Sequence, residues 1–289
     1  MRRHVRIRLH TRFSLQKYIF FRIYANFWWF LFDFFAYFVI FYYLCSVKVK
    51  IMAIGNVTPD SFYPASRLAD MNQLEAWAGN ALADGADILD IGACSTRPGS
   101  TPVDEAEEWR RLEPAFTVLK KNYPDASLSL DTFRPEIARR ALEQFGPMII
   151  NDISGGCNAM YDLVRERKAP YIWTLRGDLT LPGRMPMNDI DLILDPGFGF
   201  IGSTEADYSC MREMDSLRAY NRPVLVGVSR KSMVYKPLGI TPDTSLTPTQ
   251  VLHFYALEHG ATILRVHDVK EAKQTITLFE QLSTLNIKH

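Results

Sequence analysis

Seven short segments of this chain are apolar and end in residues that ionise, donate hydrogen bonds or bind phosphate. One of them, residues 87–91, is followed by a polar loop that carries Thr96 and Arg97. The other six end near Asn56, Asp131, Asn151, Asp195, Lys231 and His267. Because a parallel strand buried on both faces is apolar along its length, each segment is typical of a strand that delivers polar groups at its carboxyl end.

Two carboxylates and an amide at these strand ends indicate one kind of ligand. Asp131 and Asp195 follow separate apolar segments, and Asn151 follows a segment between them in the chain. Together they suit a flat heterocycle with several N–H groups, because each edge group then finds a fixed partner. Taken alone, a carboxylate after a strand is more often a helix cap or a turn former. The recurrence of polar residues at seven strand ends favours a binding site.

Cationic and donor side chains follow other apolar segments and suit an anionic leaving group, although a single lysine or arginine is more often a solvated surface charge. Asn56 offers a neutral oxygen to a hard cation such as Mg²⁺, which keeps most of its waters and relies on substrate phosphate. We therefore expect a planar polar ring and a phosphate-bearing group to bind at one opening. The donor residues are Ser229, Lys231, Arg265 and His267, with Thr96 and Arg97 on the facing loop.

The pattern that positions these residues is an alternation of strands and helices. Eight β/α units over about 240 residues match a single (β/α)₈ TIM barrel, whose working site lies at the carboxyl ends of the strands. The chain then divides into an N-terminal extension, residues 1–46, and a barrel domain, residues 47–289. We expect strands at residues 47–56, 87–91, 127–131, 148–151, 171–175, 191–195, 224–228 and 262–266. We expect helices at residues 71–85, 104–122, 135–145, 159–168, 207–220, 249–259 and 270–285.

One unit of the barrel has no room for its helix. Residues 176–190, between the fifth and sixth strands, include Gly177, Pro182, Gly183 and Pro186, and this composition excludes a helix of normal length. The barrel still closes, but the outer face of those two strands would lack its cover. We expect the N-terminal extension or a second subunit to cover it.

The N-terminal extension is rich in aromatic residues. Basic residues precede a run from Phe27 to Cys45 that is almost continuously apolar and about as long as a membrane span. However, Phe and Tyr dominate the run, and Asp33 lies within it. Three interpretations stay open: a membrane anchor or interfacial helix, a segment outside the functional protein with translation starting near Met52, or a packing role.

Composition excludes some classes of partner. The chain has 33 Lys and Arg and 32 Asp and Glu, so no basic field indicates a nucleic-acid partner. Its four cysteines lie far apart without a metal-type spacing, which favours free thiols in a reducing compartment. We expect a cytoplasmic enzyme, with membrane association through the extension left open, and we expect a homodimer.

The ordered motifs resemble those of dihydropteroate synthases, folate-pathway enzymes of the pterin-binding (β/α)₈ family. The resemblance covers residues 51–273 and is specific, because many motifs occur in the family's order. They are Asn56-Val-Thr-Pro-Asp-Ser-Phe62, Asp90-Ile-Gly with Ser95-Thr-Arg-Pro-Gly99, Asp131-Thr132, Ile150-Asn-Asp-Ile-Ser154, Asp195-Pro-Gly-Phe-Gly-Phe200, Gly227-Val-Ser-Arg-Lys-Ser232 and Arg265-Val-His-Asp-Val269.

The resemblance implies that 6-hydroxymethyl-7,8-dihydropterin diphosphate condenses with 4-aminobenzoate to give 7,8-dihydropteroate and diphosphate, the reaction that sulfonamides target. It also assigns roles residue by residue, with Lys231, Arg265 and His267 as the catalytic group. Asp131, Asn151, Asp195 and Lys231 would hold the pterin. Asn56, Arg265 and His267 would hold the diphosphate and its Mg²⁺. Phe62, Thr96, Arg97 and Ser229 would shape the aminobenzoate side.

The chain departs from the family pattern in places. After Phe200 the family usually continues Gly-Lys-Thr, whereas this chain has Ile201-Gly202-Ser203, so a lysine is lost. After the fifth strand the family commonly has Met-His, whereas this chain has Thr174-Leu175-Arg176. These departures leave a second hypothesis open, a non-catalytic homologue that binds pterin. A pterin-binding methyltransferase fits less well, because Ser95 to Gly99 and Ser229 to Lys231 follow the synthase pattern.

Overall fold

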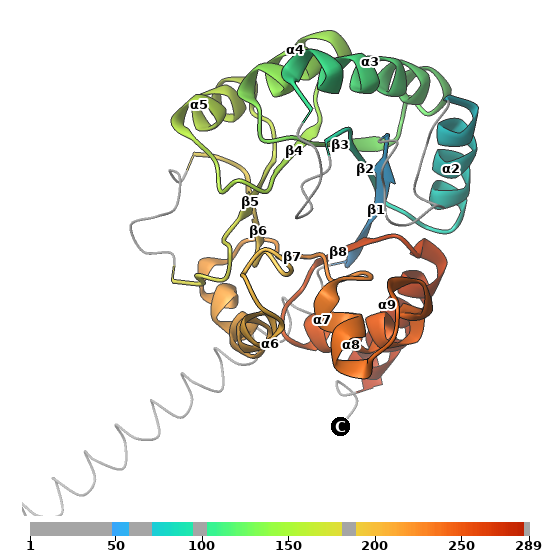
Figure 1. The fold of residues 1–289 in the computed structure, drawn as a ribbon, viewed down its shortest axis with the longest axis vertical. Coiled ribbons are helices and arrows are strands. Elements are labelled where there is room, and N and C mark those ends of the chain that lie inside the picture. The colour runs from blue at the N-terminus through green and yellow to red at the C-terminus, as the bar shows by residue number, and fades with distance from the viewer. Residues whose placement is uncertain (1–47, 58–70, 95–102, 181–188, 286–289) are drawn as a thin grey trace, which may run out of the picture. The chain divides into compact units, whose positions relative to one another are not determined.

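Eight parallel strands form a barrel that is surrounded by helices (Figure 1). A computed structural model describes residues 48–57, 71–94, 103–180 and 189–285. Neighbouring strands follow the order β6-β5-β4-β3-β2-β1-β8-β7. The strands are β1 (Lys50–Asn56), β2 (Ile88–Gly92), β3 (Ser127–Asp131), β4 (Ile149–Asp152), β5 (Tyr171–Thr174), β6 (Leu192–Asp195), β7 (Leu225–Val226) and β8 (Ile263–Val266).

The barrel closes between β6 and β7. A single parallel bridge pairs Leu194 with Val224, and the Leu194 backbone N–H donates to the Pro223 carbonyl at 2.9 Å. The other neighbours pair through regular parallel ladders, such as Ile54 opposite Asp90 and Asp131 opposite Asn151. The predicted (β/α)₈ TIM barrel is confirmed, and its strands lie within one or two residues of the expected positions at most ends.

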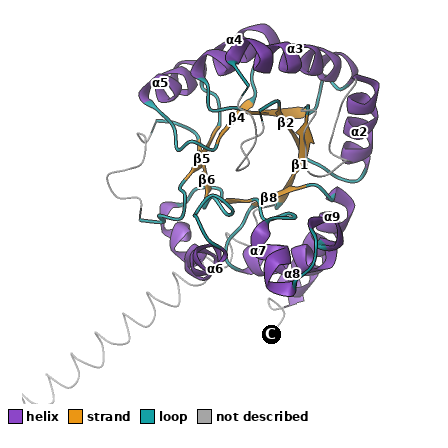
Figure 2. Ribbon diagram, viewed as in Figure 1, coloured by secondary structure: helices purple, strands orange, loops and turns teal. Residues whose placement is uncertain are grey.

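The helices follow the strands and lie outside the barrel (Figure 2). Asp104 is the N-cap of α3, as the sequence predicts. The Asp104 carboxylate accepts from the Glu107 backbone N–H at 2.8 Å. The helices are α2 (Met71–Ala83), α3 (Glu105–Asn122), α4 (Pro135–Phe145), α5 (Asn158–Arg167), α6 (Thr204–Glu213), α7 (Ser232–Tyr235), α8 (Leu246–Glu258) and α9 (Val269–Leu285), with 3-10 helices η2 (Met214–Tyr220), η3 (Lys236–Leu238) and η4 (Pro242–Thr244).

Several helical regions differ from the sequence expectation, and α8 begins at Leu246 instead of residue 249. The helix expected at residues 207–220 begins earlier, at Thr204, because Ser203 accepts from the Ala206 backbone N–H and caps α6. It then continues as the 3-10 helix η2. Four-residue α7 was not expected at all, because a segment this short has no helical periodicity to recognise.

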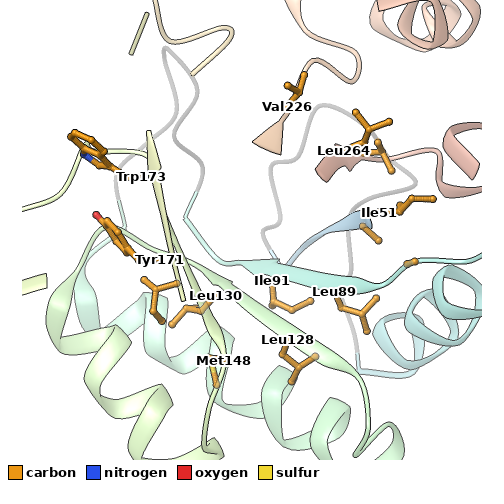
Figure 3. Packing of buried hydrophobic residues seen from close by; sticks show 14 of the residues in the cluster. Ile51, Leu89, Ile91, Leu128, Leu130, Met148, Tyr171, Trp173, Val226 and Leu264 are labelled. Carbon is orange, nitrogen blue, oxygen red and sulfur yellow. The ribbon is translucent and has the colours of Figure 1, made fainter. Parts of the chain in front are cut away.

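Two apolar layers hold the barrel together. The outer layer packs the strands against the helices (Figure 3), with Ile51, Leu89, Leu130, Tyr171 and Leu264 among its members. Alternate strand residues point inward, and a second cluster fills the interior of the barrel. Its members are Met52, Ile88, Ile172, Ile193, Leu225 and Ile263.

No helix connects β5 to β6 within the described parts of that connection, residues 175–180 and 189–191, as predicted. Every residue of both strands is nevertheless buried. Tyr171 packs edge-on against Tyr161 of α5, with ring centroids 5.9 Å apart. Leu179 and Ile190, on the two ends of the connection, are buried in the same cluster. A second subunit is therefore not needed to bury these strands.

The barrel forms one compact unit from Lys48 onward. Within the ranges that the structure describes, no helix is long and apolar enough to span a membrane. The aromatic run at residues 27–45 lies outside the described residues, so the three interpretations of it stay predictions.

Candidate active site at the carboxyl ends of the strands

A layer of polar side chains lies next to the apolar cluster that fills the interior of the barrel, on the side of the strands' carboxyl ends. Because inward-facing residues alternate along a strand, the residue two positions after a member of that cluster points into the same interior, nearer the carboxyl end. On β2, Asp90 follows Ile88 in this way, and on β8 Arg265 follows Ile263. The same step gives Asn151, Thr174 and Asp195 on β4, β5 and β6.

Arg265 joins two carboxylates at the centre of this layer. Its Nε donates to Asp90 Oδ2 at 2.7 Å, and its Nη2 donates to Asp131 Oδ2 at 2.7 Å. Asn151 Nδ2 also donates to Asp90 Oδ2, at 3.1 Å. The other oxygen of Asp90, Oδ1, is buried and has no hydrogen-bond partner among the described residues. The layer therefore holds acceptor capacity that the described protein groups do not use.

Burial and charge act against each other in this cluster. Burial raises the pKa of Asp131 to about 7, although Arg265 opposes the rise, and the neighbouring Asp90 adds to it. Burial disfavours the charged form of Arg265, but Asp90 and Asp131 outweigh this and hold its pKa above the ordinary value. The arginine therefore stays charged, whereas Asp131 changes its charge near neutral pH.

The Lys231 side chain lies in a second group, which is next to the first at the same opening. Its ammonium donates to the Phe198 carbonyl oxygen and lies 4.8 Å from the centre of the Phe200 ring. A β-carbon at Gly199 would lie only 2.9 Å from Lys231 Cδ, so the backbone there approaches the lysine closely. Gly227 joins this group to the first, because a β-carbon there would lie 3.8 Å from Lys231 Nζ and 3.7 Å from Arg265 Cβ.

Asp195 provides the carboxylate of this second group. Its Oδ1 accepts from the Gly197 backbone N–H at 2.9 Å, and Thr174 Oγ1 lies 3.4 Å from Oδ2. Burial raises the pKa of Asp195, and the nearby Lys231 opposes that rise. Burial lowers the pKa of Lys231 to about 8, while Asp195 favours its charged form. This carboxylate and this amine therefore stabilise each other's charge in a buried setting.

The loops after β7 and β8 meet at the same opening. Ser229 Oγ lies 3.1 Å from His267 Nδ1, and the His267 backbone N–H donates to Ser229 Oγ at 3.3 Å. Beside them, Arg230 and Asp268 form a doubly hydrogen-bonded ion pair. The structure thus brings the predicted donors Ser229, Lys231 and His267 to one side of the barrel mouth.

Asn56 ends β1, opposite Gly92 of β2, and is half-buried. A β-carbon at Gly92 would lie 3.2 Å from Asp131 Cβ, so this strand end borders the carboxylate group. In the described ranges no three His, Cys, Asp or Glu side chains form a metal-binding group. One amide oxygen from the protein is the kind of partial ligand set that a hydrated, phosphate-bound Mg²⁺ uses.

Sequence reasoning placed Asn56, Asp131, Asn151, Asp195, Lys231, Arg265 and His267 at one end of the barrel, and the structure has them there. Phe62, Thr96 and Arg97 lie outside the described residues, so their roles stay predictions. Two residues of the layer, Asp90 and Thr174, were not predicted to be site residues. A charge within the apolar run Ile88-Leu-Asp-Ile91 was the signal that identifies Asp90.

The arrangement can bind a flat molecule with several N–H groups and stabilise negative charge beside it. Carboxylates and the Asn151 amide supply hydrogen-bond partners for ring edges. Arg265, Lys231 and His267 supply positive charge or N–H donors in a partly desolvated opening, where such groups stabilise a departing anion most effectively.

Comparison with known proteins agrees with this chemistry. The family model described as "Pterin binding enzyme" matches residues 52–180 and 183–267. A dihydropteroate synthase of Streptococcus pyogenes serotype M3 is 34% identical over 259 residues, covering 81% of this chain and 96% of that protein.

Solved structures give the same result. The dihydropteroate synthase of Clostridium difficile, solved in the presence of pteroic acid, superposes with a TM-score of 0.73 at 30% identity, covering 81% of this chain and 97% of that one. The Xanthomonas albilineans dihydropteroate synthase, solved with 4-aminobenzoic acid, also has a TM-score of 0.73 at 30% identity, covering 81% and 93%.

Proposed function

This chain belongs to the pterin-binding enzyme family, and from that premise we propose that its barrel mouth carries out the dihydropteroate synthase reaction. The protein is a transferase of folate biosynthesis that condenses 6-hydroxymethyl-7,8-dihydropterin diphosphate with 4-aminobenzoate, giving 7,8-dihydropteroate and diphosphate. One observation carries the proposal: two carboxylates, an amide and a buried lysine converge on the same opening as Arg265.

The pterin ring binds in the interior layer. Its N–H groups donate to carboxylate oxygens of Asp131 and Asp195, and Asn151 and Lys231 contact its acceptor atoms. The free oxygen of Asp90 offers one further acceptor at the same depth. A flat ring that fills this layer satisfies buried polar groups that would otherwise lack partners, which gives specificity as well as affinity.

The reaction breaks the carbon–oxygen bond between the pterin methylene group and the diphosphate. The amine nitrogen of 4-aminobenzoate forms a bond to that methylene carbon and loses a proton, and diphosphate leaves with the electron pair of the broken bond. Because an aryl amine is a weak nucleophile, stabilising the leaving group is the main task. Arg265 and His267 do this while the protein holds the two substrates in line. No covalent enzyme intermediate is needed.

Mg²⁺ is part of the proposal, with Asn56 as its protein ligand. The fit is partial by nature, since a single neutral oxygen at a strand end leaves the remaining positions to water and to the diphosphate of the substrate. When bound, the ion neutralises charge on the diphosphate. Thr96, Arg97, Phe62 and Ser229 form the aminobenzoate side, and of these Ser229 is within the described structure, next to His267.

A turnover assay tests the proposal. Full-length protein and residues 47–289 should release diphosphate only when both substrates and Mg²⁺ are present. Lys231→Ala should lose most of that activity while keeping the fold by circular dichroism. A folded preparation that releases no diphosphate would contradict the proposal. If calorimetry then showed tight binding of the pterin diphosphate, the non-catalytic homologue would be the better account, in line with the lysine that is lost after Phe200.

We also propose that the protein is a homodimer. Three large apolar side chains on neighbouring helices are exposed: Val251 of α8 at 64%, and Leu278 and Leu282 of α9 at 63% and 53%. Helices α8 and α9 contact each other, and an apolar face of this kind favours burial against a second copy.

A cytoplasmic location is proposed as well, in keeping with the free thiols of Cys94, Cys157 and Cys210. Membrane association through residues 1–46 stays a prediction.

A further inference from the structure

A buried ion pair joins the loops that follow the last two strands. Arg230 Nε donates to Asp268 Oδ2 at 2.9 Å, and Arg230 Nη2 donates to Asp268 Oδ1 at 2.6 Å. The two side chains are only 7% and 13% exposed. This parallel pairing uses the planar fork of arginine, which fixes direction as well as distance. Neither residue is needed to contact either substrate in the proposed reaction.

The backbone of Arg230 has an unfavourable conformation that the ion pair can stabilise. Arg230 has a φ of +57°, a left-handed conformation that is unfavourable for a residue with a β-carbon. Its chain neighbours are Ser229 and Lys231, both of which line the opening. A force that keeps Arg230 in this conformation therefore sets the directions in which the serine and the lysine point.

Asp268, which holds the Arg230 side chain, is itself fixed by a backbone hydrogen bond. Its carbonyl oxygen accepts from the Ala272 backbone N–H at 3.1 Å, so Asp268 is tied to the first turn of the 17-residue helix α9. Its chain neighbour His267 meets Ser229 through the contact at 3.1 Å. Two adjacent residues of one loop thus pair with two adjacent residues of the other.

We propose that the Arg230–Asp268 ion pair is a positioning device, which holds the left-handed turn after β7 against the start of α9 and thereby fixes Ser229 and Lys231 opposite His267. The inference rests on the proposed function for the roles of those three residues. It adds two residues that act through their neighbours and do not touch substrate.

The state of Lys231 reports on this positioning. The turn holds the lysine between the Phe198 carbonyl and the Phe200 ring, where burial lowers its pKa to about 8. The charged groups that act on it are Asp195, Asp207 and Asp131, which favour the ammonium, and Arg265, which disfavours it. If the turn is released, Lys231 moves into water, and its pKa rises toward the ordinary lysine value of about 10.4.

The experiment compares four variants of the full-length chain. Asp268→Asn removes the charge of the acceptor, and Arg230→Ala removes the guanidinium group but keeps the β-carbon. Arg230→Gly also removes the side chain, but glycine adopts the left-handed turn without strain. The matched control is Asp215→Asn in η2, which breaks a pair with Arg218 and His259 outside the proposed site. Each variant is checked for folding by circular dichroism.

Two readouts are measured on each variant. The rate at which acetic anhydride labels Lys231, followed by mass spectrometry as a function of pH, gives the lysine pKa without any turnover. Steady-state kinetics give KM for the pterin diphosphate and kcat separately. We expect Asp268→Asn and Arg230→Ala to raise the lysine pKa by at least one unit and to raise that KM about tenfold or more. Arg230→Gly should lose less than Arg230→Ala, and Asp215→Asn should change neither readout.

The inference is overturned if folded Asp268→Asn and Arg230→Ala proteins label Lys231 along the wild-type pH curve. It is also overturned if Arg230→Gly is as impaired as Arg230→Ala, or if Asp215→Asn produces the same changes. A wild-type protein that lacks turnover would contradict the proposed function instead. The labelling curves would still decide the positioning role in that case.

Discussion

Asp90, which was not predicted as a site residue, accepts hydrogen bonds from two residues of the site. It is fully buried, accepts from Asn151 and Arg265, and lies beside Asp131 through their shared arginine. A buried charge of this kind is stable only while its partners are present. The cluster is therefore a unit in which the loss of one member affects the others.

Replacing Asp90 with Asn tests that interdependence. Among the described residues, the substitution leaves Arg265 with Asp131 as its one ion-pair partner, and breaking a buried pair in this way costs about 3 kcal/mol. We expect Tm to fall by roughly 6–12 °C and kcat/KM for the pterin diphosphate to fall more than tenfold. The control is Asp189→Asn, because Asp189 is 52% exposed in its pair with Arg165 and should contribute under about 1 kcal/mol. Equal shifts in the two variants would contradict the central role of Asp90.

The pH dependence of activity follows from Asp131 and Lys231. Asp131 ionises in the folded protein near pH 7 and must be a carboxylate to accept from the pterin. Lys231 loses its proton near pH 8, and only its ammonium form gives the pterin a charged hydrogen-bond donor. Both requirements are met only in a narrow range, so kcat/KM for the pterin diphosphate should rise up to about pH 7 and fall above about pH 8. Both values belong to the free enzyme.

Lys231→Arg is the matching variant for the alkaline limb. Arginine stays charged at every accessible pH, so the fall above pH 8 should disappear even if overall activity drops. Initial rates at low pterin diphosphate concentration, measured from pH 5 to 10, check this. An alkaline limb that is unchanged in the arginine variant would show that another group is responsible.

At the scale of single elements, β1 and α2 pack too closely to admit even one extra methyl group. A β-carbon at Gly55 would lie 2.7 Å from Trp77 Cη2 and 2.9 Å from Ile91 Cδ1. We expect Gly55→Ala to cost about 1–3 kcal/mol through overpacking, which thermal unfolding measures. Combining it with Trp77→Leu should restore part of that loss, because the smaller side chain makes room. An additive double variant would contradict the packing account.

The same scale shows what sequence reasoning can recover. Strands were predictable because buried parallel strands are continuous apolar runs, and their polar ends were visible as breaks in those runs. Asp90 was missed as a site residue because it lies inside such a run rather than at its end. Four-residue α7 was missed because it spans barely one helical turn, so its apolar residues cannot repeat with the helical period. The ion pair between Arg230 and Asp268 joins residues 38 positions apart, and no local pattern predicts such a pairing.

At the scale of the whole molecule, the exposed apolar face of α8 and α9 predicts self-association. Val251→Glu with Leu278→Glu should convert a dimer of residues 47–289 to a monomer, because two charges on each copy would otherwise be buried without partners. Sedimentation velocity at micromolar concentration measures the change. Leu238→Glu, at an exposed position in η3, is the control and should remain dimeric. A wild-type protein that sediments as a monomer would contradict the proposal.

The flank of the barrel at β5 and β6 has no helix among its described residues. The outward side chains of β5 and β6 are buried, and Leu179 and Ile190 belong to the same apolar cluster. The described members of that cluster pack against one another and lie in residues 49–276, outside the N-terminal extension, residues 1–46. We therefore expect their deletion to change Tm by less than about 2 °C, compared in the same buffer. A fall of about 5 °C or more would mean that the extension covers this flank, because only a loss of buried apolar area on that scale explains it.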